Sequence, residues 1–304
     1  MDTAMHVRLL LDRLQQATWE LTALVIALRD DRPIDPDLLA TARQVLIELE
    51  LMSATPGGSL PAPGLAELIA DGGINFASEA AAPVLQCAAL LSGSAAWTTQ
   101  DDDSLLAQGR ASAQAAAPFK RFILPALDGL ADLFAGVSPT MLDVGVGVGA
   151  MAAEYCRTFP SLRVVGIDVF PRALGLARTV IDEAGVSDRV ELRQQDVATL
   201  ADRNVFAFAW LPAPFVPRAA LEAGLPRLAA SLVPGGWLMV GHGKFQGDAL
   251  KNAVNRLKTS AYGGTPLDDP ETQTLLRDVG LELVSTVPTP EGAPGLTVGR
   301  RAKS

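Results

Sequence analysis

Three glycines on alternate positions follow an acidic residue in the middle of the chain, where Asp143 precedes Gly145, Gly147 and Gly149. The apolar run before Asp143 and the helix-forming residues after Gly149 predict a strand, a tight turn and a helix. Glycine allows positive φ angles in such a turn and lets a ligand approach bare backbone, and the new helix begins with unpaired N–H groups. The stretch 141–150 therefore predicts a cofactor-binding site.

Asp143 separates the two cofactor classes that use a loop of this kind. The spacing from Gly145 through Gly147 to Ala150 also fits the dinucleotide pattern G-x-G-x-x-G/A. In a dinucleotide site the turn faces a pyrophosphate, which a carboxylate before the first glycine would repel. A ligand with an ammonium and a sulfonium group would be attracted instead. An NAD(P)-dependent oxidoreductase stays an alternative, disfavoured also because the sequence has no recognisable Tyr/Lys or His/Asp set for hydride transfer.

The residues 142–149, Leu-Asp-Val-Gly-Val-Gly-Val-Gly, resemble the D/E-x-G-x-G-x-G first motif of class I S-adenosylmethionine (SAM) methyltransferases. Val146 is a small departure, because the family often has a small or polar residue at that place. The resemblance implies SAM as the cofactor, bound by Asp143 and the three glycines. It also implies an α/β fold, a Rossmann-like seven-stranded methyltransferase sheet with a mainly helical N-terminal domain.

A second carboxylate, Asp168, ends the apolar run 162–168 about twenty residues after the glycine turn. A carboxylate at that place could accept both ribose hydroxyls of an adenosine, each hydrogen bond contributing about 1.5 to 3 kcal/mol where water is excluded. Val169 would pack beside the adenosine. This acid supports either cofactor class.

A third carboxylate lies in the stretch 190–197, which resembles the third motif of the same family. The acid of that motif usually accepts a hydrogen bond from the adenine amine, so the resemblance assigns this role to Asp196 and places Val197 beside the cofactor. Asp143, Asp168 and Asp196 each end a predicted strand, and open α/β sheets bind ligands at that edge. Their agreement is the strongest functional signal in the sequence.

The elements that must position these acids alternate between strand and helix from Thr140 onward, which is typical of a parallel sheet with crossover helices. The last two predicted strands, joined through Pro288 to Pro294, should form a hairpin at the sheet edge. Seven strands with an antiparallel final member are the order of the methyltransferase family. The predicted strands are 140–144, 163–168, 189–193, 205–210, 237–241, 281–287 and 295–300.

The stretch 210–215 follows the fourth predicted strand and is expected to shape the acceptor site. Plant-type O-methyltransferases carry a tryptophan here, followed shortly by the catalytic His-Asp pair. Trp210 fits that tryptophan and is assigned to the cofactor side, but Ala213 and Pro214 stand where the His-Asp pair is expected. The base of that family is therefore missing, and a SAM-fold protein that no longer transfers methyl groups is a further alternative. Phe215 is predicted to contact the substrate.

His242 is one of two histidines in the chain and lies directly after the fifth predicted strand, flanked by Gly241 and Gly243. A neutral imidazole at the active edge could accept the proton of the methyl acceptor. We predict a general-base or substrate-orienting role for His242. The alternative is a histidine whose hydrogen bonds are satisfied within the protein and which only supports the site.

The N-terminal part, residues 1–112, is expected to be a helical, winged-helix-like dimerisation domain, followed by a SAM-binding domain over residues 113–304. Trp97, Leu105 and Gly109 weakly match the linker region of the O-methyltransferase family. A helix over 115–135 with a kink at Pro125 should follow. The resemblance places this helix over the cofactor site, where Phe119 would form a wall for the acceptor. Core packing is the alternative.

Composition limits the partners of the 304-residue chain. A formal charge of −9 and a pI near 4.8 argue against nucleic acid or an anionic membrane, because a phosphate-binding face needs clustered Lys and Arg. Cys87 and Cys156 have no metal or disulfide spacing, and the acidic triplet 101–103 is more typical of a helix start than of a metal site. No targeting or membrane segment is apparent. We therefore expect a cytoplasmic homodimer without metal that acts on a small, apolar or aromatic metabolite.

Overall fold

The computed structural model describes residues 3–28, 33–72, 76–93, 101–245, 248–290 and 293–303. The chain divides into two compact units, Met1–Ser92 and Gly93–Ser304. The sequence placed this boundary later, between residues 112 and 113. Helix α5 (Asp102–Ala113) belongs to the second unit because it packs on α8 (Ala150–Thr158).

The start of α5 is the acidic triplet. Asp101 caps the helix by accepting a hydrogen bond from the backbone N–H of Ser104 at 2.7 Å, and Asp102 pairs with Arg172 at 2.7 Å. Two of the three carboxylates therefore have helix-cap and ion-pair roles. Trp97, which the sequence match to a linker region includes, lies outside the described residues.

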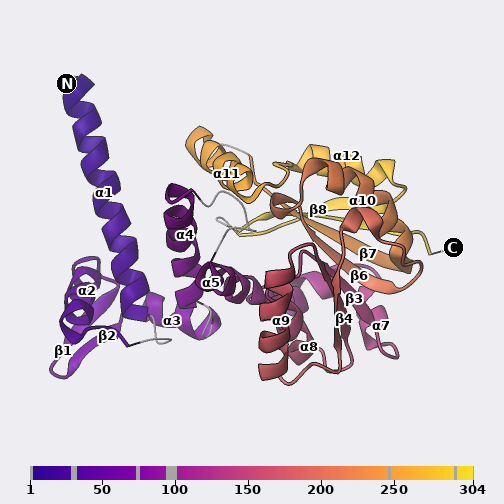
Figure 1. Ribbon diagram of the computed structural model, residues 1–304, viewed down its shortest axis with the longest axis horizontal. Helices are drawn as coiled ribbons and strands as arrows, with labels where there is room; N and C mark the ends of the chain where they lie inside the picture. Colours follow the sequence, from indigo (N-terminus) through magenta and orange to yellow (C-terminus); the bar gives the residue numbers. More distant parts are fainter. Residues whose placement is uncertain are drawn as a thin grey trace. The chain divides into compact units, whose positions relative to one another are not determined.

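The first unit contains helices and one short hairpin. Its core is small and apolar, with Leu46 fully buried among Ala23, Ala42, Met52 and Leu65. Among the described residues, no helix is both long enough and apolar enough to cross a membrane. The elements follow the predicted order of helix, hairpin and helix: α1 (Thr3–Leu28), α2 (Pro36–Glu48), β1 (Met52–Thr55), β2 (Gly58–Pro61), α3 (Pro63–Gly72) and α4 (Phe76–Leu91) (Figure 1).

The second unit is built on a seven-stranded sheet of order β5-β4-β3-β6-β7-β9-β8. Strand β9 pairs antiparallel with both β7 and β8, whereas the pairs from β5 to β7 are parallel. This confirms the predicted seven strands and the final hairpin. The strands are β3 (Thr140–Val144), β4 (Arg163–Asp168), β5 (Val190–Gln194), β6 (Phe206–Pro212), β7 (Leu232–His242), β8 (Glu282–Val287) and β9 (Gly295–Arg300).

Helices cover both faces of this sheet, so its central strands are apolar on both sides (Figure 1). On one face α8 and α9 (Pro171–Glu183) pack against residues such as Met141 and Phe208. On the other face α10 (Arg218–Ser231) and α12 (Asp269–Asp278) pack against Leu142 and Leu211. Both faces of the central strands are closed to solvent, and the carboxyl edge of the strands is left for function.

The segment before β3 differs from the predicted single helix over 115–135. It consists of α6 (Ala116–Pro118), a π-helical turn (Phe119–Ile123), a 3-10 turn (Leu124–Ala126) and α7 (Leu130–Ala135). Pro125 lacks the N–H that would continue the helix, the backbone is extended at Leu127, and Gly129, with φ 75°, precedes the start of α7. The sequence predicted a kink, and the structure has a break.

Candidate active site

The glycine turn joins β3 to α8 as predicted. Gly145, Gly147 and Gly149 have φ angles of 68°, 55° and 74°, which side-chain-bearing residues rarely adopt. A Cβ at Gly145 or Gly147 would meet no atom closer than 3.8 Å, whereas one at Gly149 would lie 2.9 Å from the Ile181 side chain. Gly149 therefore serves helix packing, and the first two glycines leave open backbone that a ligand can approach.

Val146 fits this turn because of a glycine on the neighbouring strand. Both N–H groups of Gly145 and Val146 donate to the carbonyl oxygen of Ile167. A Cβ at Gly166 would lie 2.6 Å from Cγ2 of Val146. The Val146 side chain, which departs from the family motif, therefore fits because Gly166 has no side chain. Sequence inspection missed this pairing because the two positions are far apart in the chain.

Asp143 lies fully buried on β3 beneath the turn, and neither carboxylate oxygen has a hydrogen-bond partner among the described residues. Burial raises the pKa of this carboxyl group to about 8, with a smaller contribution from the charge of Asp168. A buried carboxylate without a donor is costly, so the position is poor for structure alone. A cationic ligand group would supply the missing partner.

Asp168 lies at the end of β4 and is tied to the glycine turn. Its Oδ2 accepts a hydrogen bond from the Gly147 N–H and its Oδ1 accepts one from the Phe170 N–H, both at 2.9 Å. Burial raises the pKa of Asp168, and these backbone donors oppose the shift. Each carboxylate oxygen has a second acceptor position, so two ribose hydroxyls could still be bound. Val169 beside it is exposed, which leaves an apolar side chain at this edge.

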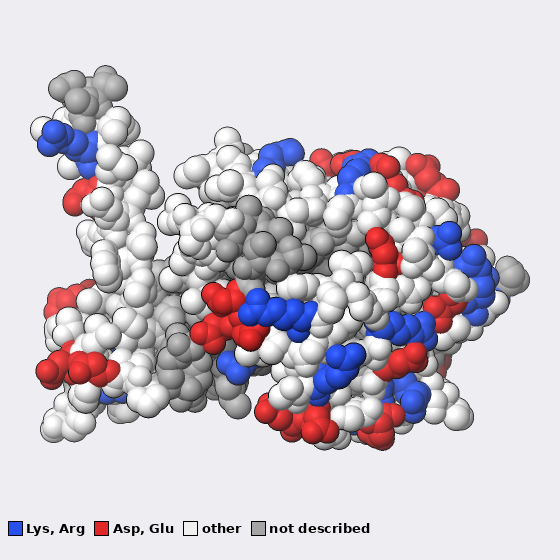
Figure 2. Space-filling model, viewed as in Figure 1, with Lys and Arg blue, Asp and Glu red and all other residues white. Residues whose placement is uncertain are grey.

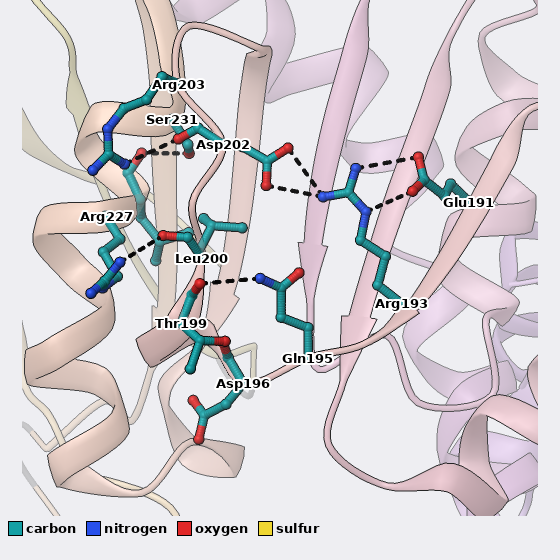
Figure 3. Close-up of polar contacts among 11 residues, drawn as sticks. Glu191, Arg193, Gln195, Asp196, Thr199, Leu200, Asp202, Arg203, Arg227 and Ser231 are labelled. Atoms are coloured by element: carbon teal, nitrogen blue, oxygen red, sulfur yellow. Dashed lines mark hydrogen bonds and ion pairs between the residues drawn. The ribbon is translucent and has the colours of Figure 1, made fainter.

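Asp196 follows β5 and caps the short turn Val197–Thr199, because its Oδ1 accepts a hydrogen bond from the Ala198 N–H at 2.8 Å. Its carboxylate points away from the neighbouring ion-pair cluster in Figure 3. Val197 is predicted to lie beside the cofactor, and its side chain is buried against Gly224 of α10. Only the backbone of Val197 is left to meet a cofactor.

The turn that carries Asp196 is held by the ion-pair cluster drawn in Figure 3. Arg193 lies between Glu191, at 2.7 Å, and Asp202, at 2.9 Å. The Gln195 amide donates to the Thr199 carbonyl at 3.3 Å. These contacts join β5 to the loop before β6, and they were not identified from the sequence, because Asp202 lies outside the strand that carries Arg193 and Glu191.

Trp210 and Phe215 lie around the carboxyl end of β6. Trp210 is opposite Asp143 in the β3–β6 register, and a Cβ at Gly241 would come within 2.3 Å of the Trp210 ring. The Phe215 ring packs on Tyr262, with centroids 4.7 Å apart. Tyr262 ends α11 (Ala249–Tyr262) and was not identified from sequence, because nothing in that helix pattern distinguishes it.

The rigidity of this corner comes from a close backbone contact. Gly264 follows α11, and a Cβ there would lie 1.9 Å from the Pro214 carbonyl oxygen. The N–H of Thr265 donates to the Ala213 carbonyl at 2.9 Å. Pro214 is thus held against the chain that follows α11, which gives the loop after β6 a defined position.

His242 is not placed as a general base. It is 1% exposed, with Nδ1 2.9 Å from the Gly243 carbonyl oxygen and Nε2 2.9 Å from Thr297 Oγ1 and 3.0 Å from Asp269 Oδ1. Both ring nitrogens are therefore engaged by protein groups, Nδ1 by the Gly243 carbonyl and Nε2 by Thr297 and Asp269. The predicted catalytic role is therefore corrected to the alternative of a satisfied supporting histidine that links β7 to β9 and α12.

Phe119 is also a packing residue and not an acceptor wall. It is 1% exposed and lies 4.8 Å from Phe208, 5.2 Å from Tyr155 and 5.7 Å from Phe134, measured between ring centroids. Such tilted aromatic clusters are typical of cores. Phe119 belongs to the apolar cluster between the sheet and α8.

Comparisons with known proteins find similar methyltransferases. A family model described as a methyltransferase domain matches residues 141–236. The chain is 26% identical over 194 residues to the release factor glutamine methyltransferase of Vibrio cholerae, covering 56% of this chain and 60% of that protein. It is 38% identical over 60 residues to the Rhodopirellula baltica protein of the same name, covering 20% of each. The chain thus spans less than two thirds of the length of these relatives.

Solved structures resemble the chain over its full length. An O-methyltransferase family protein from Burkholderia thailandensis has a TM-score of 0.67 at 16% identity, covering 100% of this chain and 99% of that one. Human N-acetylserotonin methyltransferase, solved with SAM, has a TM-score of 0.64 at 16% identity and covers 99% of both chains. Residues 141–236 are therefore similar to a methyltransferase domain. The fold is that of the class I SAM-dependent methyltransferases, within which the similar solved structures are of the O-methyltransferase type.

Proposed function

We propose that the protein transfers the methyl group of SAM to a small molecule. The observation that carries the choice of cofactor is Asp143, a buried carboxylate beneath an open glycine turn that has no hydrogen-bond partner in the described part of the chain. A ligand that brings an ammonium and a sulfonium group compensates this carboxylate, whereas the pyrophosphate of NAD(P) would face it with like charge. The methyltransferase strand order adds support against an oxidoreductase.

The residues at the carboxyl edge match the chemical groups of SAM. The open backbone at Gly145 and Gly147 admits close contact, and Asp168 retains acceptor positions for the ribose hydroxyls. Asp196 has one oxygen outside its cap contact that could accept from the adenine amine. Val169 offers apolar surface to the adenosine.

SAM, if bound, would supply a methyl group on a cationic sulfur, and that sulfur would leave as a neutral thioether when the methyl group passes to the acceptor. The chain contributes by orienting the acceptor and excluding water, since positioning alone can lower the barrier by several kcal/mol, roughly 7 or more in well-oriented systems. Ala213 and Pro214 occupy the place of the family base, and His242 is engaged elsewhere. We infer that the acceptor is a group that loses its proton without an enzyme base, such as an amine or an acidic hydroxyl.

The acceptor is proposed to be apolar or aromatic, because Trp210, Phe215 and Tyr262 lie around the end of β6. On the face shown in Figure 2, basic and acidic side chains of the second unit are interspersed and form no continuous basic surface. The alternative is a polypeptide acceptor, because the chain is also similar to release factor glutamine methyltransferases. The fold similarity to small-molecule enzymes over both units favours the metabolite.

The test is incubation of the purified protein with methyl-labelled SAM and a cell extract separated into a metabolite fraction and a protein fraction. Label should enter the metabolite fraction and move with an extractable apolar compound. Label confined to protein bands would contradict the small-molecule acceptor. Binding of SAM without any transfer would favour the non-methylating alternative, and tight NAD(P) binding without SAM binding would favour the oxidoreductase.

We also propose that the protein is a homodimer assembled through its first unit. Helix α1 exposes an apolar set that its own unit does not cover: Leu9, Leu10, Leu14 and Trp19 are between 44% and 73% exposed. Light scattering at micromolar concentration should give the dimer mass, and Leu10→Glu with Leu14→Glu should give the monomer mass. Gln15→Glu on the same helix is the control, and a wild-type monomer would contradict the proposal.

A further inference from the structure

The inference concerns the proton of Asp143, and it rests on the proposed SAM cofactor. Asp143 is enclosed between strands β4 and β6 and covered by the glycine turn, with both oxygens out of contact with solvent. The titratable groups that face it are Asp168 on β4 and Tyr155 on α8. The neighbour on β6 is Trp210, which carries no charge.

None of these neighbours stabilises a negative charge on Asp143. The carboxylate of Asp168 disfavours it, and Tyr155 is itself fully buried in the aromatic core, where its own pKa is raised by burial and by Asp143. No described Lys or Arg lowers the pKa of Asp143, and no described N–H or O–H donates to it. In the absence of a cationic ligand the neutral acid is therefore the favoured form.

We propose that the binding of SAM is coupled to the release of a proton from Asp143, so that the residue is a neutral acid in the cofactor-free protein and a carboxylate in the complex. The O–H bond of the acid breaks, its electron pair stays on the carboxylate, and the proton passes to solvent. The cation of the cofactor then takes the place of the proton. Cofactor binding and proton binding compete for one residue.

The coupling has a direct thermodynamic consequence. A ligand that requires the ionised form binds more tightly as pH rises toward the pKa of the free protein, which for Asp143 is about 8. Between pH 5.5 and 7 the affinity for SAM should rise by close to tenfold per pH unit. Over this range the α-amino group of the cofactor stays mostly protonated, because such groups have a pKa near 7.7 to 8.0. The expected change in affinity therefore reports ionisation of the protein and not of the cofactor.

The experiment is titration calorimetry of the full chain with SAM at pH 6.5 in phosphate, PIPES and imidazole, which have different ionisation enthalpies. The slope of observed heat against buffer enthalpy should correspond to release of about one proton by the wild type. Asp143→Asn keeps the shape of the side chain without its proton, and its slope should be near zero. Asp168→Asn should retain the release, because burial is the larger cause at Asp143.

Each outcome of this experiment supports or contradicts the proposal. SAM binding with a zero slope in the wild type overturns the proposal and leaves the methyltransferase function intact, whereas absence of SAM binding refutes the proposed function itself. A release that disappears in Asp168→Asn and persists in Asp143→Asn also overturns it. S-adenosylhomocysteine separates the two cations, since it keeps the ammonium and lacks the sulfonium. Release with both ligands supports pairing with the ammonium, and release with SAM alone supports pairing with the sulfonium.

If Asp143→Asn fails to fold, the affinity of the wild-type protein for SAM, measured between pH 5.5 and 7, still tests the proposal. A tenfold rise per unit supports the coupling. A flat profile contradicts it.

Discussion

At the scale of single residues, Asp168 combines the proposed contact to the ribose with a structural role in the glycine turn. It was predicted to bind the ribose, and the structure shows that it also receives the N–H groups of Gly147 and Phe170. Loss of the carboxylate would therefore remove a ligand acceptor and release the glycine turn. The two effects act in the same direction on cofactor affinity.

Asp168→Ala should weaken SAM binding by about 2 to 4 kcal/mol, because two charge-assisted acceptors are lost in a water-poor site. Titration calorimetry measures the change, and circular dichroism checks that the fold survives. Glu183→Ala, an exposed carboxylate at the end of α9, is the matched control and should leave the affinity unchanged. An unchanged dissociation constant for Asp168→Ala would mean that this carboxylate does not meet the cofactor.

The position of His242 in the sequence suggested a catalytic role, whereas its contacts in the structure predict a role in stability. Its ring nitrogens are bound to Gly243, Thr297 and Asp269, and Gly295 has no room for a Cβ, which would lie 2.3 Å from the imidazole. His242→Ala should lower the free energy of unfolding by about 2 to 4 kcal/mol, because the buried polar partners lose their contact. Turnover at a temperature where the variant is folded should fall less than about fivefold.

Chemical denaturation and initial-rate measurements on the same preparation test this. His6→Ala, which removes the other, exposed histidine on α1, is the control. A loss of turnover of about a hundredfold with unchanged unfolding would restore the general-base role.

At the scale of elements, the glycine turn depends on a partner strand. Gly166 on β4 has no space for a side chain because Val146 of the turn fills it. Gly166→Ala should destabilise the protein by about 1 to 3 kcal/mol, since overpacking in a close-packed core forces displacement. The double variant with Val146→Ala should recover part of the loss. Thermal unfolding of the four proteins measures the coupling, and additive effects would show that the two side chains do not compete for space.

At the scale of the whole molecule, Asp143 links stability to pH. In the unfolded chain its carboxyl group ionises near 3.8, whereas the folded protein keeps the proton until about pH 8. Between these values the folded state binds more protons than the unfolded state, so this residue lowers stability as pH rises, by up to about 1.4 kcal/mol per unit. The stability that the neutral Asp143 adds to the folded state is fully present below about pH 4 and is lost by about pH 8.

Asp143→Asn should remove this slope, so that the variant gains stability relative to the wild type as pH rises from 5 to 8. The measurement is the difference in unfolding free energy between the two cofactor-free proteins, because other carboxyl groups cancel in that difference. Saturating SAM should reduce the wild-type slope, since the cation replaces the proton. Parallel pH profiles for both proteins would show that Asp143 is ionised in the cofactor-free fold.

The sequence by itself determined the sheet and the edge that binds the cofactor. Strand patterns are local, and Asp143, Asp168 and Asp196 each lie at or just after the carboxyl end of one strand, so the topology of parallel strands brings the three acids to one edge. Only the tertiary structure decided the roles of His242 and Phe119. Their chemistry depends on Asp269, Thr297 and the aromatic core, which are distant in sequence and become neighbours only when the chain packs. The type of a side chain determines which chemistry is possible, and its burial and hydrogen-bond partners in the folded protein determine whether that chemistry is available.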